Sequence, residues 1–174
     1  WVRRTAAVLL AGIVLVHGYA LTTRLTQLLF YRDRYPIDAF AFMVDRQLNG
    51  KLVVAFNWSQ YAIAAFSPDV QVHFDGRYDT CYPQEVVDSH FDFLLGTHHG
   101  KRHRSRKSGA IDGTRAISQG LPDLVLIDRQ YRHAVDIMEW ESNRLDTPWT
   151  LLYQDGIAQL WGRRSRYDHP SSQA

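Results

Sequence analysis

The hydrophobic pattern of the chain changes its period after the first third. Residues 5–23 carry no formal charge, over about 19 positions, which is close to the length that crosses the apolar part of a bilayer. Residues 36–48 place apolar side chains at helical spacing behind a proline, which suits a first helical turn. After Asn49 and Gly50, short β-rich runs alternate with amphipathic segments. The pattern predicts an apolar N-terminal helix followed by a mixed α/β domain.

Within that domain, three runs of aliphatic and β-branched residues predict strands, at residues 52–56 (LVVAF), 70–74 (VQVHF) and 124–127 (LVLI). Two further segments predict helices, at residues 83–95 and 130–141. Since strands that alternate with helices tend to pair in parallel, we expect a small two-layer or three-layer α/β domain with a mostly parallel sheet. Two apolar runs around Asp155 and Gly156 predict a C-terminal β-hairpin.

These patterns divide the chain into three parts. Residues 1–35 form the predicted transmembrane and juxtamembrane helix, because residues 22–35 mix leucines with arginines as a helix does where it leaves the headgroup layer. Residues 36–163 form the α/β domain. Residues 164–174 are polar and are predicted to be a disordered tail.

Three interpretations fit the uncharged segment: a transmembrane helix, the apolar region of a cleaved signal peptide, and a buried helix of a globular protein. We expect the first. Arg3 and Arg4 precede the segment, so the positive-inside tendency predicts an integral membrane protein with its domain on the extracytoplasmic side. The chain begins with Trp1 and not with Met, and we therefore expect it to be part of a longer protein.

Composition narrows the range of partners. The formal net charge is +2, and because a nucleic-acid partner requires cations clustered on one face, none is predicted. Cys81 is the single cysteine, which excludes an intrachain disulfide framework. The 45% hydrophobic content over 174 residues suits one buried core.

The segment between residues 54 and 82 carries the first candidate chemistry. Asn57, Trp58 and Tyr61 follow the first predicted strand, and Asp75 and Arg77 follow the second. Since open α/β sheets bind ligands at the carboxyl ends of their strands, these five residues are the candidate ligand-binding groups, with the aromatic rings stacking on a sugar. The alternative interpretation is structural: the aromatic rings pack a core, and the two opposite charges pair across a turn.

The second candidate is a basic loop at residues 96–113. Its cations could contact anionic lipid headgroups or a polyphosphate carrier, and they are Lys101, Arg102, Arg104, Arg106 and Lys107. The alternative is a solvated insertion without a ligand. The histidines of the loop lack the fixed spacing of a metal site, so no metal ion and no cofactor are predicted.

Four elements of the chain resemble a known family. They are FNWSQY (residues 56–61), VHFDGR (72–77), PDLVLI (122–127) and WTLLYQD (149–155), in that order. They resemble the segment that follows the last membrane helix of bacterial multi-pass GT-C-type glycosyltransferase-like proteins, and the resemblance spans most of residues 36–163. Ser59 and Gln60 stand where that family usually has a pair of glycines.

The resemblance implies a GT-C architecture, in which the catalytic carboxylates lie on early extracytoplasmic loops that this chain does not contain. It therefore implies a location in the bacterial inner membrane and a non-catalytic extracytoplasmic domain that covers an active site or assists in binding an acceptor or a polyprenyl-phosphate-linked sugar. No catalytic residue is predicted within the chain, which we expect to be inactive alone. The alternative function is a stand-alone membrane-anchored module that binds an anionic ligand.

Overall fold

The computed structural model describes residues 2–26, 34–99 and 104–167 and divides the chain into two compact units, residues 1–31 and residues 32–174. The first unit contains the helix α1 (Val2–Thr26). Its stretch Arg4–Thr22 has 19 residues and a mean hydropathy of 1.8. By length and composition, α1 could therefore cross a membrane. Residues 27–33 of the predicted juxtamembrane helix lie outside the described residues, and Arg34 and Tyr35 form a turn and a bend instead of a helix.

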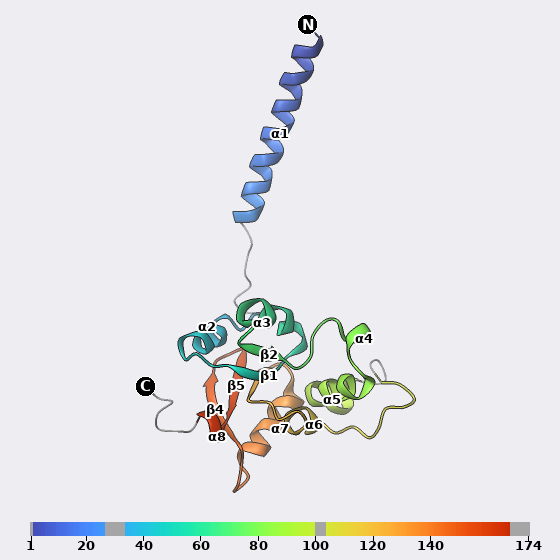
Figure 1. Cartoon of the computed structure of the whole chain (residues 1–174), viewed down its shortest axis with the longest axis vertical. Helices are drawn as coiled ribbons and strands as arrows, with labels where there is room; N and C mark the ends of the chain where they lie inside the picture. Colours follow the sequence, from blue (N-terminus) through green and yellow to red (C-terminus); the bar gives the residue numbers. More distant parts are fainter. Residues whose placement is uncertain (1, 27–33, 100–103, 168–174) are drawn as a thin grey trace. The chain divides into compact units, whose positions relative to one another are not determined.

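The described strands of the second unit form one five-stranded sheet in the order β2-β1-β3-β5-β4 (Figure 1). Their bounds are β1 Gly50–Val54, β2 Val70–Val72, β3 Leu124–Asp128, β4 Trp149–Gln154 and β5 Ala158–Arg163. β1 pairs in parallel with both β2 and β3, whereas β5 is antiparallel to both of its neighbours. β5 therefore runs against the other four strands, and the predicted mostly parallel sheet with a C-terminal hairpin is confirmed.

Helices cover both faces of the sheet (Figure 1). Leu52 and Val54 of β1 pack in one core cluster with residues of α2 (Ile37–Asp45) and α3 (Ser59–Phe66). Val53, which points to the opposite face, packs with residues of α5 (Gln84–Leu95) and α7 (Arg132–Ser142). The alternation along one strand thus supports three layers, and the predicted α/β class is confirmed.

The segments after β1 and β2 differ from the prediction. β1 and β2 each end two residues before the predicted strands do, at Val54 and Val72. A 3₁₀ turn, η1 (Phe56–Trp58), and α3 follow β1 directly. Trp58, Ala62 and Phe66 are buried at four-residue spacing, which is the periodicity of one helix face. Other short elements are α4 Tyr78–Cys81, η2 Gly96–His99 and α6 Arg115–Ser118.

The predicted disordered tail is partly ordered. Its first four residues form the short helix α8 (Arg164–Tyr167) directly after β5. The Tyr167 hydroxyl donates to the Asn49 carbonyl at 2.7 Å, and an Arg166 guanidinium nitrogen lies 3.0 Å from an Asp123 carboxylate oxygen. Because these contacts join α8 to segments more than 40 residues earlier, the first part of the tail belongs to the domain. Residues 168–174 lie outside the described residues.

Candidate functional site at the carboxyl ends of the strands

The carboxyl ends of β1 and β3 form the topological switch point of the sheet. β1 lies between β2 and β3, so the chain leaves β1 toward one neighbour and later returns on the other side. Asn57 in η1 donates from Nδ2 to Asp128 Oδ2 at 3.3 Å, across these two strand ends. The other carboxylate oxygen of Asp128 accepts the Gln130 backbone N–H at 2.9 Å. An amide and a carboxylate therefore meet where open α/β sheets bind ligands.

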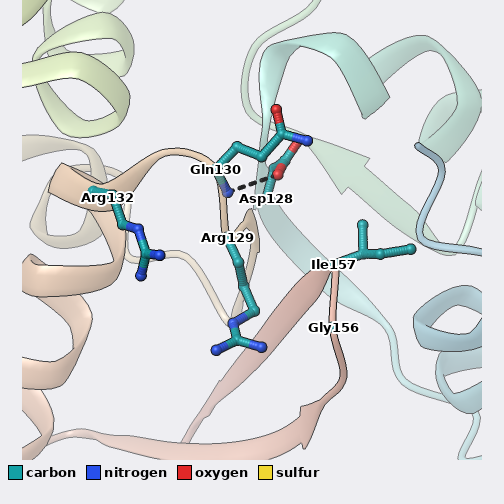
Figure 2. Close-up of a pocket in the computed structure, with 6 residues that line it drawn as sticks. All are labelled: Asp128, Arg129, Gln130, Arg132, Gly156 and Ile157. Atoms are coloured by element: carbon teal, nitrogen blue, oxygen red, sulfur yellow. Dashed lines mark hydrogen bonds between the residues drawn. The ribbon is translucent and has the colours of Figure 1, made fainter. Parts of the chain in front are cut away.

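A pocket of about 310 Å³ opens beside Asp128, between the start of α7 and the β4–β5 turn (Figure 2). Its lining residues are Asp128, Arg129, Gln130, Arg132, Gly156 and Ile157. None of these residues was a candidate binding residue from the sequence. The signal that could have identified them is a run of polar residues directly after the apolar strand, since such residues reach the carboxyl edge of the sheet.

Asp75 and Arg77 form a structural network at the end of β2. Asp75 is 1% exposed and accepts from the Arg77 backbone N–H at 2.9 Å, from Arg77 Nε at 3.0 Å and from Arg77 Nη2 at 2.6 Å. The Tyr82 hydroxyl donates to Asp75 Oδ2 at 3.0 Å. These bonds, those from the Arg77 side chain first, lower the pKa of Asp75 to about 2. The carboxylate is therefore ionised and held in place at neutral pH, as the structural interpretation predicts.

The ends of β1 and β2 lie close together through Gly76. A Cβ atom at Gly76 would lie 2.7 Å from Nε2 of Gln60, at the start of α3. The ring centroids of Phe56 and Phe74, which follow β1 and β2, lie 5.9 Å apart. Asp75, Gln60, Asn57 and Asp128 thus follow one another along the carboxyl edge of the sheet.

The two candidate aromatic residues belong to the core on this edge. Trp58 is fully buried, and its Nε1 donates to the Arg34 carbonyl at 2.9 Å. Tyr61 is half-buried and stacks on Phe40 with the ring centroids 5.0 Å apart. Trp58 has no exposed ring face on which a sugar could stack. The structural interpretation of Trp58 therefore fits the geometry.

The basic loop is anchored to the domain. Arg104 donates to Asp92 Oδ1, and Arg115 Nη2 lies 2.9 Å from Asp92 Oδ2. Asp92 itself is fully buried in α5. Arg104, one of the five candidate lipid contacts, is thus held by a buried carboxylate. Arg106 and Lys107 are exposed, whereas Lys101 and Arg102 lie outside the described residues.

His90 is a further buried ionisable group near this edge. It is fully buried and stacks on Phe74, with the ring centroids 4.3 Å apart. Neither of its ring nitrogens has a hydrogen-bond partner among the described residues. Burial, with a smaller contribution from the charge of His73, lowers the pKa of His90 to about 3. His90 is therefore neutral in the folded protein at any pH above about 3.

We expect acid to destabilise the domain through His90. The pKa of His90 in the folded state lies below the ordinary value of 6.5. Between these two pKa values the unfolded chain therefore binds a proton at His90 that the folded chain does not bind. The stability that neutral His90 supports is complete above about pH 6.5 and falls as the pH decreases toward 3. At pH 5 the loss should be about 2 kcal/mol. Urea unfolding at pH 7 and pH 5 measures it.

The His90→Phe variant supplies the comparison, because a phenyl ring keeps the stack on Phe74 and cannot be protonated. It should lose about 2 kcal/mol less than the wild type between the two pH values. Asp75 does not interfere, since its pKa changes from 3.8 to about 2 on folding and its effect falls below about pH 4. An equal loss in both proteins would contradict the burial of an unprotonated His90.

The site thus consists of the Asn57–Asp128 pair, the adjoining pocket and the Asp75 network at the end of the neighbouring strand. In the described part of the chain, no group of three or more His, Cys, Asp or Glu side chains is arranged to hold a metal ion. Comparison of the chain with family models, with curated proteins and with solved structures found no match.

Proposed function

We propose that this chain is a non-catalytic extracytoplasmic domain of a multi-pass, GT-C-type glycosyltransferase-like membrane protein, where it assists in binding a lipid-linked sugar or its acceptor. The observation that carries the proposal is the Asn57–Asp128 pair at the switch point of the sheet, beside an open polar pocket. The resemblance of four sequence elements supplies the enzyme class, and α1 supplies a helix long and apolar enough to cross a membrane.

Carboxylate and amide groups suit a sugar because a carboxylate accepts hydrogen bonds from hydroxyl groups, whereas an amide can both accept and donate, in a fixed geometry. Asp128 is 4% exposed and its oxygens are oriented by Asn57 and by the Gln130 backbone. An oriented acceptor discriminates between sugar hydroxyls better than a mobile surface carboxylate does. These properties support a binding role for the pair.

A non-catalytic role is supported by the other buried carboxylates. Asp75 accepts hydrogen bonds from Arg77 and Tyr82, and Asp92 forms ion pairs with two arginines. Their partners among the described residues are arginines, backbone N–H groups and the Tyr82 hydroxyl, whose pKa is raised by burial so that it donates as a neutral phenol. Asp75 is thereby held ionised, whereas the general acid that cleaves a glycosidic bond must carry a proton. The placement outside the cytoplasm is supported by Arg3 and Arg4, immediately before the uncharged segment.

A second candidate is a stand-alone membrane-anchored module for an anionic ligand. The exposed side chains of Arg106 and Lys107 favour it, since they are available to anionic headgroups. This function would leave binding independent of Asn57 and strongly dependent on the basic loop.

We expect the chain in lipid nanodiscs to bind a short polyprenyl-phosphate sugar without turnover. Asn57→Ala should weaken this binding about 10-fold, because one oriented hydrogen-bond partner of Asp128 and of the ligand is lost. Asn143→Ala is the matched control: Asn143 is exposed at the far end of α7 and should bind as the wild type does. Ligand titration followed by tryptophan fluorescence measures both.

Two results would contradict the proposal. One is a wild-type titration in which the nanodiscs give the same fluorescence signal with and without the sugar lipid. The other is sugar transfer by the purified chain that is lost on Asp75→Asn, which would make the strand-end network catalytic. Loss of binding in a variant with Arg106 and Lys107 replaced, with Asn57→Ala unaffected, would favour the second candidate.

A further inference from the structure

We propose that the pocket beside Asp128 is a phosphate subsite, in which Arg129 and Arg132 bind the phosphate of a glycosyl phosphate whose sugar lies against Asn57 and Asp128. The inference rests on the proposed function and deepens it, because it names the part of the ligand that this pocket takes. The residues that carry it were not among the candidates from sequence.

The first support is the arrangement of charge in the pocket. Figure 2 shows both guanidinium groups on the side of the pocket away from the Asp128 carboxylate. Asp128 directs its oxygens to Asn57 and to the Gln130 backbone N–H, at 3.3 and 2.9 Å. A ligand with hydroxyls at one end and a phosphate at the other would match this separation of acceptor and cations.

The second support is that Arg129 is held in position by the β4–β5 turn. Its Nη1 donates to the Asp155 carbonyl at 2.6 Å, and its backbone N–H donates to the Ile157 carbonyl at 2.8 Å. The turn is fixed in its own right, because Asp155 Oδ1 accepts the backbone N–H groups of Ile157 and Ala158, both at 2.7 Å. A guanidinium has five N–H donors, so the bond to Asp155 orients Arg129 and leaves donors for an anion.

The third support is the position of Arg132. It is exposed and is the first residue of α7, and its guanidinium approaches the pocket from the side opposite the turn (Figure 2). The partial positive charge at the start of this helix adds to that of the two arginines. With two cations and one carboxylate in the lining, the formal charge of the pocket is positive, and its volume of about 310 Å³ lies at the lower end of the range for small-ligand sites.

The test uses the full chain in nanodiscs of neutral lipid, titrated separately with a hexose 1-phosphate, with the free hexose and with inorganic phosphate. We expect the hexose phosphate to bind most tightly and Arg132→Gln to weaken it about 10-fold to 100-fold, since a charge-assisted bond is lost. Binding of the free hexose should not change. Arg129→Gln should act in the same direction, but Arg132 is the decisive position because its side chain is exposed and the fold does not depend on it.

Arg144→Gln is the matched control, because it removes an exposed cation beyond the far end of α7, outside the pocket; its affinity for the hexose phosphate should equal that of the wild type. A titration with vesicles of phosphatidylglycerol tests the other source of phosphate. If binding to those vesicles requires Arg132 and the hexose phosphate does not bind, the assignment to a glycosyl phosphate is wrong.

If the hexose phosphate binds and its binding depends on Asn57 but not on Arg132 or Arg129, the subsite is wrong while the proposed function stands. If neither sugar nor sugar phosphate binds, both proposals are wrong.

Discussion

Asp92→Ala is expected to lower the free energy of unfolding of the α/β domain by about 3–5 kcal/mol, because removal of one partner from a buried ionic cluster leaves the others uncompensated. Asp92 is fully buried, and it accepts bonds from Arg104, from Arg115 Nη2 at 2.9 Å and from the Asp112 backbone N–H at 3.1 Å. The variant would leave two guanidinium groups without their carboxylate. Urea unfolding at pH 7 measures the loss.

The same change should release the basic loop, since Asp92 accepts hydrogen bonds from Arg104 in the middle of the loop and from the Asp112 backbone near its end. Limited trypsin digestion is expected to cut after Arg106 or Lys107 faster in Asp92→Ala than in the wild type. Asp136→Ala is the matched control, because Asp136 lies exposed on the helix α7 and should change stability by no more than about 0.5 kcal/mol. A stable Asp92→Ala protein with unchanged digestion would show that the cluster does not anchor the loop.

The second large effect is expected at Trp58. Trp58→Ala should cost about 3–5 kcal/mol, because it removes a fully buried indole and leaves a cavity between α3 and the sheet. The Arg34 carbonyl would also lose the Nε1 donor that lies 2.9 Å away. Trp58→Phe retains an aromatic ring and should cost less than Trp58→Ala. It still loses the same hydrogen-bond donor, and this loss alone should cost about 1–3 kcal/mol. Thermal and urea unfolding of both variants measure the difference.

Trp140→Ala serves as the control for Trp58, because Trp140 is 60% exposed and the Arg144 guanidinium carbon lies 5.4 Å from its ring centroid. It should cost about 1 kcal/mol or less. If Trp58→Ala kept wild-type stability and lost only ligand binding, Trp58 would be a sugar-stacking residue, as the first interpretation of its position holds.

Patterns along the chain were sufficient to predict the architecture. β1 and β3 each contain a run of consecutive buried apolar residues, at 52–54 and 124–127, and Asp155-Gly156 marks the hairpin turn. α3 was not predicted because it has only eight residues, which is too short for a helical period to be separated from that of the neighbouring apolar runs. Short buried runs of this kind do not distinguish a strand from a helix.

The candidate site was harder to predict than the fold. Asn57 was selected because it follows a strand, but its partner Asp128 lies 71 residues later and is brought to it only by the pairing of β1 with β3. Arg104 resembled its solvated neighbours in composition, since nothing in the local sequence shows that Asp92 is buried. Long-range pairings of this sort depend on tertiary structure, which a local pattern does not contain.

The strand order has a consequence for the synthesis of the chain. β3 lies at the middle of the sheet, but one of its two neighbours is β5, which ends at Arg163. During translation the central strand therefore keeps an unpaired, apolar edge until the hairpin has emerged, and such edges invite pairing with other chains. The contacts that close the sheet are also far apart in sequence, which slows folding. The nascent domain thus passes through a stage in which protection from aggregation must come from outside the sheet.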